Sequence, residues 1–92
     1  MNNKAMLHIG FGNIVMLGRV IAIISPDSAP VKRIVTEAKE KGNVIDVTHG
    51  RRTRAVIMMD NDTVILSSLT SETLGGRISG KLQEDEDEKG DF

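Results

Sequence analysis

Two segments of this chain are apolar on both faces of a strand. They are Val20–Ile24 and Ala55–Met59, in which apolar residues follow one another without polar alternation. A strand with one wet face alternates apolar and polar side chains, so both faces of these segments must be covered. One strong helix can cover one face of a small sheet. We therefore expect a second subunit to cover the other face; the alternative is that a second helix and the loops close it within the monomer.

The strong helix follows Ser28 and ends before Gly42. Its apolar residues have the i, i+3, i+4, i+7 spacing of one helix face and are Val31, Ile34, Val35 and Ala38. Ser28 is suited to the N-cap, and Pro30 to the first turn, where a backbone N–H has no helical partner. Gly42 provides the left-handed residue at which helices commonly end.

Five segments have the residue pattern of strands, namely residues 6–9, 14–24, 44–48, 54–59 and 63–69. Gly18 and Arg19 interrupt the second of them, as a bulge or a further turn. Short, turn-rich links join the last three, which predicts an antiparallel meander. A weaker pattern over residues 71–79 predicts a short C-terminal helix. The fold class is therefore α+β, an antiparallel β-sheet with one main helix.

Charge is divided unevenly along the 92 residues. Residues 81–92 hold two Lys against six Asp or Glu, whereas residues 1–80 hold ten Lys or Arg against seven acids. We expect one domain, residues 1–80, and a disordered acidic tail, residues 81–92. A basic body with an acidic tail is one pattern of proteins with a nucleic-acid partner, but charge alone favours a solvated surface with a solubilising tail.

Several classes of protein are excluded by what the sequence lacks. It has no cysteine, so it has no disulfide and no thiolate metal site. No secretory signal or membrane-length apolar run is present, which predicts a cytoplasmic protein without membrane contact. His8 and His49 lie on different segments without ligand spacing, and nothing assembles an acid, a base and a nucleophile. We expect no enzyme activity, no metal, no cofactor and no small-molecule substrate.

The basic residues that are candidates for a binding site are Arg19, Lys32, Arg33, Arg51, Arg52 and Arg54. Arg51 and Arg52 fall at a predicted hairpin tip, and Arg54 begins the next strand. A guanidinium matches phosphate oxygens with two parallel hydrogen bonds. The same residues would also serve solubility or salt bridges between subunits. The chain has no Trp or Tyr and only two Phe to stack single-stranded bases, which disfavours a single-stranded partner and leaves binding to a duplex backbone.

Three motifs carry a family resemblance, and they are Ile-Gly-Phe-Gly-Asn-Ile-Val at residues 9–15, Ser-Pro-Asp-Ser-Ala-Pro-Val-Lys-Arg-Ile at residues 25–34 and Gly-Arg-Arg-Thr-Arg-Ala-Val-Ile at residues 50–57. In this order they resemble the RemA family, the extracellular matrix regulatory proteins of Bacillus and its relatives. The resemblance runs from about residue 6 to residue 77.

The resemblance implies a nucleoid-associated regulator that activates biofilm matrix genes by binding double-stranded DNA. It also implies a fold related to LytTR DNA-binding domains and a ring of identical subunits that wraps duplex. The family's DNA-contacting arginines correspond to Arg19, Arg51 and Arg52. The alternative function is a structural or adaptor protein whose arginines contact other subunits or a protein partner.

Overall fold

The computed structural model describes residues 5–80. The acidic tail that the sequence predicts to be disordered lies outside them. The elements are β1 (Met6–Gly10), β2 (Asn13–Met16), a 3-10 turn (Leu17–Arg19), β3 (Val20–Ile24), α1 (Ala29–Glu40), β4 (Val44–Asp46), β5 (Ala55–Met59), β6 (Val64–Ser67) and α2 (Ser71–Ser79). Within the described residues, neither helix has the length and apolar character needed to cross a membrane. The fold is mixed α+β with two helices, and α2 confirms the predicted C-terminal helix.

The central sheet has four strands in the order β3-β5-β6-β4. β6 is antiparallel to β5 but parallel to β4, so the predicted antiparallel meander is wrong and the sheet is mixed. The reason is that β6 inserts between β4 and β5, and residues 47–54 must therefore pass over the end of β6. Val47 N–H donates to the Leu66 carbonyl at 3.0 Å, and Arg54 N–H to the Ser67 carbonyl at 2.8 Å, on either side of that crossing.

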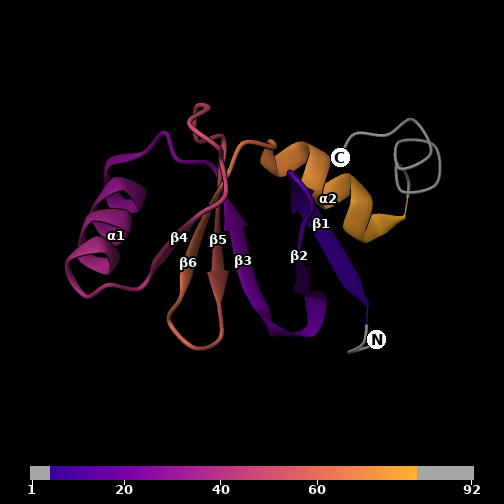
Figure 1. The fold of residues 1–92 in the computed structure, drawn as a ribbon, viewed down its shortest axis with the longest axis horizontal. Coiled ribbons are helices and arrows are strands. Elements are labelled where there is room, and N and C mark those ends of the chain that lie inside the picture. Colours follow the sequence, from indigo (N-terminus) through magenta and orange to yellow (C-terminus); the bar gives the residue numbers. More distant parts are fainter. Residues whose placement is uncertain (1–4, 81–92) are drawn as a thin grey trace.

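One face of this sheet packs against α1 (Figure 1). Ala38 of the helix joins Val56, Val64 and Leu66 of the sheet in a buried cluster. The predicted ends of the helix are confirmed. The Ser28 hydroxyl accepts a hydrogen bond from the Val31 N–H at 3.4 Å, Pro30 lies in the first turn, and Gly42 follows with a φ of 76°.

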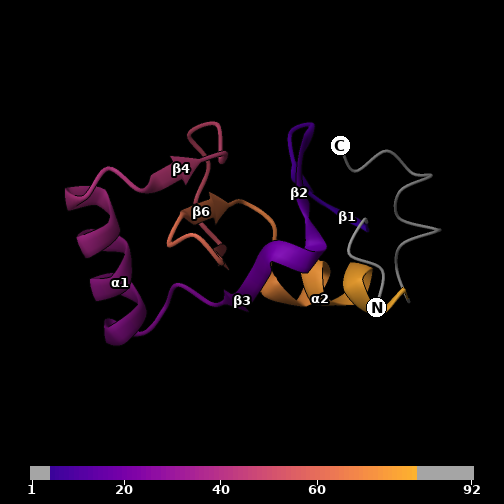
Figure 2. The ribbon, with the colours of Figure 1, turned by 90° about the horizontal axis from the view of Figure 1, so that it is seen from below.

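The other face is covered by α2 and by the antiparallel β1–β2 hairpin (Figure 1, Figure 2). Leu7, Ile9 and Leu74 from these elements pack with Ile57 and Ile65 of the sheet. The predicted interruption at residues 18–19 is the 3-10 turn, and it places β2 and β3 in different sheets. The β1–β2 hairpin therefore packs across one face of the four-stranded sheet, to which β3 belongs.

Both faces of β5 are consequently covered within one chain. Ala55, Val56 and Ile57 are fully buried, so the expectation that a second subunit must cover this strand is wrong. The hairpin and α2 close the second face, which is the alternative that the sequence left open. The other apolar segment, β3, differs, because its Ile21 is 65% exposed and is not covered by the described residues. A further apolar surface lies on the outer side of the hairpin, where Met6 and Ile14 are 54% and 46% exposed.

Candidate nucleic-acid interface

Two tight turns come together near the amino-terminal end of β5. The first joins β1 to β2, and its central residues Phe11 and Gly12 have φ values of 54° and 78°. The second lies in the link between β4 and β5, where the Arg51 N–H donates to the Thr48 carbonyl at 3.0 Å. Its central residues, His49 and Gly50, have φ values of 55° and 80°. Two successive positive φ angles are the pattern of a type I′ turn in both cases.

The second turn is braced by Asp46 at the end of β4. Its Oδ1 accepts hydrogen bonds from the backbone N–H of Thr48 at 2.8 Å and from the Thr48 hydroxyl at 2.7 Å. The hydroxyl bond, followed by the backbone bond, lowers the pKa of Asp46 below its ordinary value of 3.8 because both stabilise the carboxylate. Thr48 itself is buried, so the start of the turn is held against the body of the domain.

The two turns contact each other through aromatic rings. The rings of Phe11 and His49 stack with their centres 4.4 Å apart and their planes inclined by 14°. The guanidinium carbon of Arg51 lies over the Phe11 ring, 5.7 Å from its centre. That separation is within the range of a cation–π interaction. The sequence places Phe11 in a turn but does not predict this contact, because the two rings are far apart along the chain.

Beside the stack lies a hollow of about 580 Å³, lined by Gly10, Phe11, Arg51, Arg52, Arg54, Ser68 and Leu69. Its three arginines are all exposed. The described lining contains no carboxylate, so positive charge dominates there. The structure thus brings three of the predicted site residues together. The predicted hairpin tip is wrong, however, because the arginines lie in the link that crosses β6.

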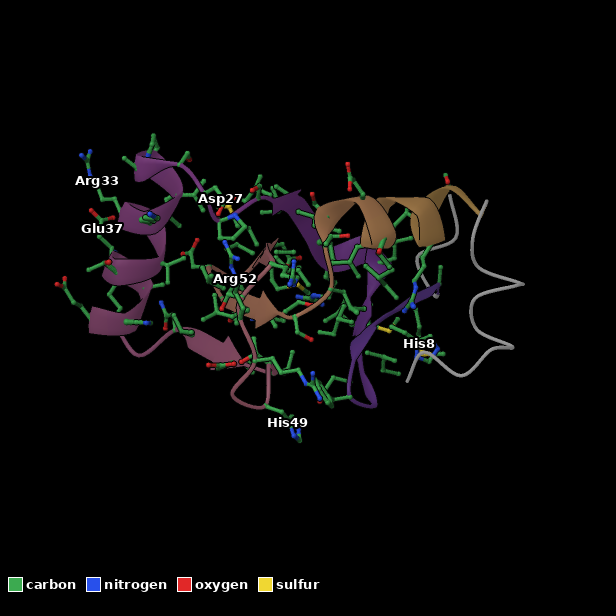
Figure 3. All side chains as sticks on the ribbon, turned by 90° about the horizontal axis from the view of Figure 1, so that it is seen from above. His8, Asp27, Arg33, Glu37, His49 and Arg52 are labelled. Carbon is green, nitrogen blue, oxygen red and sulfur yellow. The ribbon has the colours of Figure 1, made fainter. Side chains whose placement is uncertain are left out.

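A neighbouring hollow of about 340 Å³ has a different balance of charge. Arg52 and Arg54 also line this one, together with Asp27 and Glu72. Figure 3 shows Asp27 and Arg52 in the same part of the molecule. Two carboxylates beside two guanidiniums make this second hollow a poor anion site. The first hollow is therefore the stronger candidate.

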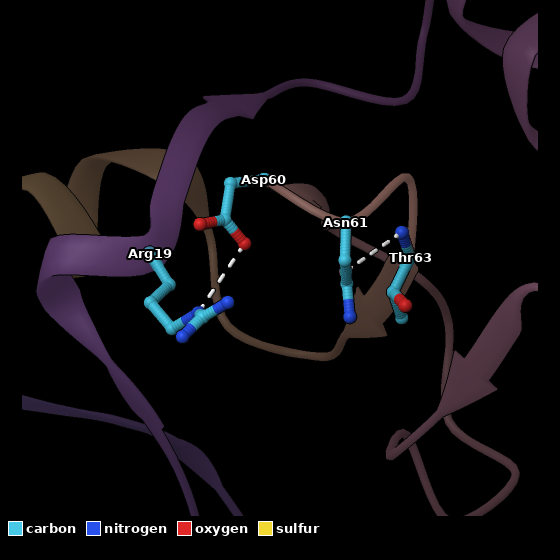
Figure 4. Close-up of polar contacts among 4 residues, drawn as sticks. All are labelled: Arg19, Asp60, Asn61 and Thr63. Carbon is cyan, nitrogen blue, oxygen red and sulfur yellow. Dashed lines mark hydrogen bonds and ion pairs between the residues drawn. The ribbon is translucent and has the colours of Figure 1, made fainter.

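Arg19 lies at the other end of the sheet. Val20 faces Met59 and Ile24 faces Val56, so Arg19 neighbours Asp60 at the end of β5 that is remote from Arg54. The five residues of β5 span about 17 Å at roughly 3.3 Å per residue. The Arg19 Nε lies 3.3 Å from Asp60 Oδ1 (Figure 4), and the two side chains are 64% and 43% exposed.

Lys32 and Arg33 are exposed on α1 and do not line the hollow. Figure 3 shows Arg33 beside Glu37 on the outer side of α1, away from Arg52. His8 and His49 also lie far apart in that view. Over residues 5–80, no group of three or more potential ligand side chains is placed to hold a metal ion.

Comparison with known proteins places this site in a family context. The RemA-like family, described as extracellular matrix regulatory protein A-like, matches residues 6–78, which include every residue that lines the arginine hollow. A protein of Clostridium kluyveri is 58% identical over 81 residues, which are 88% of each chain. One of Carboxydothermus hydrogenoformans is 56% identical over 80 residues, 87% of this chain and 92% of the relative. One of Halothermothrix orenii is 59% identical over 76 residues, 83% and 90% of the two chains. All three are provisionally named regulatory proteins.

Proposed function

Because this chain belongs to the RemA-like family, whose relatives carry regulatory-protein names, we propose that it is a transcription regulator that binds duplex DNA. The observation that carries the proposal is the hollow with three exposed arginines. Guanidinium groups bind phosphate oxygens bidentately, and each phosphate contact releases condensed counterions. Arg51, Arg52 and Arg54 are thus the proposed phosphate-binding residues.

The contacts of the aromatic ring favour duplex over single-stranded nucleic acid. Proteins that bind single strands stack bases on exposed aromatic faces. Phe11 is already stacked on His49 and lies under Arg51. Phe11 is 41% exposed, but a base that stacked on its ring would compete with His49 and Arg51, so what the site offers to a ligand is mainly guanidinium charge. Charge of this kind suits the backbone of a duplex.

The finer part of the proposal follows the family resemblance. The domain would be related to LytTR DNA-binding domains, and identical subunits would close into a ring that wraps DNA and activates extracellular matrix genes. Repetition of a small cationic site around a ring raises affinity by avidity. Such a ring would also let one duplex contact both the arginine hollow and Arg19, although these lie at opposite ends of β5 in one chain.

The DNA-binding proposal is tested by comparing Arg52→Ala with Arg33→Ala. Each removes one exposed arginine, but only Arg52 lines the hollow. Arg52→Ala should weaken binding to all duplex sequences alike and flatten the slope of log affinity against log salt by about one unit. Arg33→Ala should have little effect. Fluorescence anisotropy with a labelled duplex over a salt series measures both. Equal losses of affinity in the two variants would contradict the assignment of Arg52 to the DNA-binding site. A wild-type protein that binds no DNA would favour the adaptor function.

The assembly proposal has its own test at the outer face of the β1–β2 hairpin. Ile14 is 46% exposed there and contributes to neither buried cluster of the described domain. Ile14→Asp should therefore give a folded protein of smaller size, measured by light scattering coupled to size exclusion. The matched substitution Val56→Asp should unfold the chain, because Val56 is fully buried. Wild-type protein that is monomeric at high concentration would rule out the oligomer.

A further inference from the structure

Phe11 is an unusual residue at the first left-handed position of the β1–β2 turn. The first central position of a type I′ turn favours Asn or Asp followed by Gly. This chain has Phe11-Gly12 in one turn and His49-Gly50 in the other. A bulky side chain at a φ of 54° is strained, and such strain persists where it serves a function. Turn formation alone therefore does not account for the aromatic residue at position 11.

The contacts of the Phe11 ring give it another role. Its ring is stacked on His49 and lies beneath the guanidinium of Arg51. Arg51 is an exposed side chain with many rotamers, and ordering such a side chain on binding opposes association. A ring that already holds the guanidinium reduces the conformational entropy that Arg51 loses on binding. Phe11 and Arg51 also line the same hollow, so the contact lies at the proposed binding site.

We infer that Phe11 is a positioning residue that holds Arg51 ready for a phosphate group, and that His49 in turn fixes the Phe11 ring. This inference rests on the proposed DNA binding and deepens it. In this scheme Phe11 does not contact the phosphate. It acts through Arg51, whose guanidinium is pre-organised before DNA arrives.

The turn chemistry supplies a variant that removes the ring and preserves the fold. Phe11→Asn creates Asn-Gly, the dipeptide most favoured in type I′ turns, so the β1–β2 hairpin should form at least as well. Its DNA affinity should fall by about two- to fivefold, the size expected for an exposed cation–π contact. Phe11→Tyr keeps the ring and should bind as the wild type does.

A double-mutant comparison separates positioning from a general structural role. In an Arg51→Ala background, Phe11→Asn should cause no further loss of affinity, because the residue that it positions is gone. In an Arg54→Ala background the same change should still cause its full two- to fivefold loss. Equal losses in both backgrounds would overturn the inference.

A measurement without DNA makes the inference independent of the proposed function. NMR relaxation of the arginine Nε–H groups in the free protein should show Arg51 more ordered than Arg54 in the wild type. Phe11→Asn should lower the order of Arg51 alone. If Arg51 were as mobile in the wild type as in the variant, Phe11 would not position it. If the wild type bound no DNA, the proposed function would fail, while the relaxation data would still decide the role of Phe11.

Discussion

Asp60 competes with DNA for Arg19 in the proposed function. The carboxylate of Asp60 lies 3.3 Å from the Arg19 Nε. A phosphate that binds this guanidinium must therefore displace the carboxylate or share the guanidinium with it. Asp60→Asn keeps the size of the side chain and removes its charge. The backbone hydrogen bond from Asp60 N–H to the Arg19 carbonyl, 2.9 Å long, is available to either side chain. The variant should therefore fold normally and bind DNA more tightly.

The size of this gain follows from the exposure of the pair. Two unit charges about 4 Å apart in water attract by about 1 kcal/mol. Exposed ion pairs in proteins contribute roughly 0–1 kcal/mol, and Arg19 and Asp60 are 64% and 43% exposed. Release of Arg19 should thus raise affinity by at most about fivefold for each subunit that contacts DNA. The gain should shrink as salt rises, because salt screens the attraction.

Asp62→Asn is the matched control for this experiment. Asp62 lies in the same turn, is exposed, and has a φ of 68°, which Asn tolerates well. The substitution changes the net charge of the protein by the same amount as Asp60→Asn does. The Asp62 side chain, however, makes no ion pair with Arg19. Anisotropy titrations of both variants over a salt series would measure the difference. A gain of equal size in both, or a loss of affinity in Asp60→Asn, would refute the competition.

Three further predictions concern stability and the acidic tail. Leu74→Ala should lower the free energy of unfolding by about 3–5 kcal/mol in urea titrations, because Leu74 is fully buried between α2 and the sheet; a loss below about 1 kcal/mol would mean that α2 is loosely packed. Thr48→Val removes the hydroxyl donor to Asp46, whose lowered pKa stabilises the fold above pH 3.8 and ceases to do so as the pH falls through the lowered value. Urea titrations on both sides of that range should therefore show a weaker acid dependence in the variant, and an unchanged dependence would contradict the role of this bond. Truncation after Gly80 removes a segment with a net charge of −4 and should tighten DNA binding at low salt only; equal affinity across the salt series would leave the tail a role in solubility alone.

The parts of the fold that follow from local chemistry could be predicted from the sequence. The bounds of α1 depend on a hydroxyl at Ser28, a ring at Pro30 and a left-handed glycine at Gly42. Each of these acts on residues within one turn of itself. The weaker helix α2 was predictable for the same reason, since Thr70 caps it through a hydrogen bond from the Thr73 N–H.

The pairing of β4 could not be predicted in this way. The segment from Thr48 to Arg51 forms a real type I′ turn, and such a turn normally joins two adjacent antiparallel strands. Here β6 occupies the place between them, and no local feature of residues 44–59 reveals a strand that comes later in the chain. The location of Arg51 at a hairpin tip was mispredicted for the same reason.

The candidate site shows a similar division. Arg51, Arg52 and Arg54 are close in sequence, so their proximity in the hollow was predictable. The Phe11 ring reaches them from a turn far earlier in the chain, and only the packed structure brings it to His49. A phenylalanine between two glycines, at a position where Asn is favoured, is the sequence signal that could have drawn attention to it.

The central place of β6 has a consequence for how the protein is made. Of the described strands, β6 is the last to be synthesised, and within the described sheet it is the only neighbour of β4. Both anchors of the arginine-bearing link, at Val47 and Arg54, are hydrogen bonds to β6. A chain that ends before residue 64 keeps the local bonds of the turn at Thr48–Arg51 but lacks both of these anchors. The arginines therefore reach their binding arrangement only after β6 has joined the sheet.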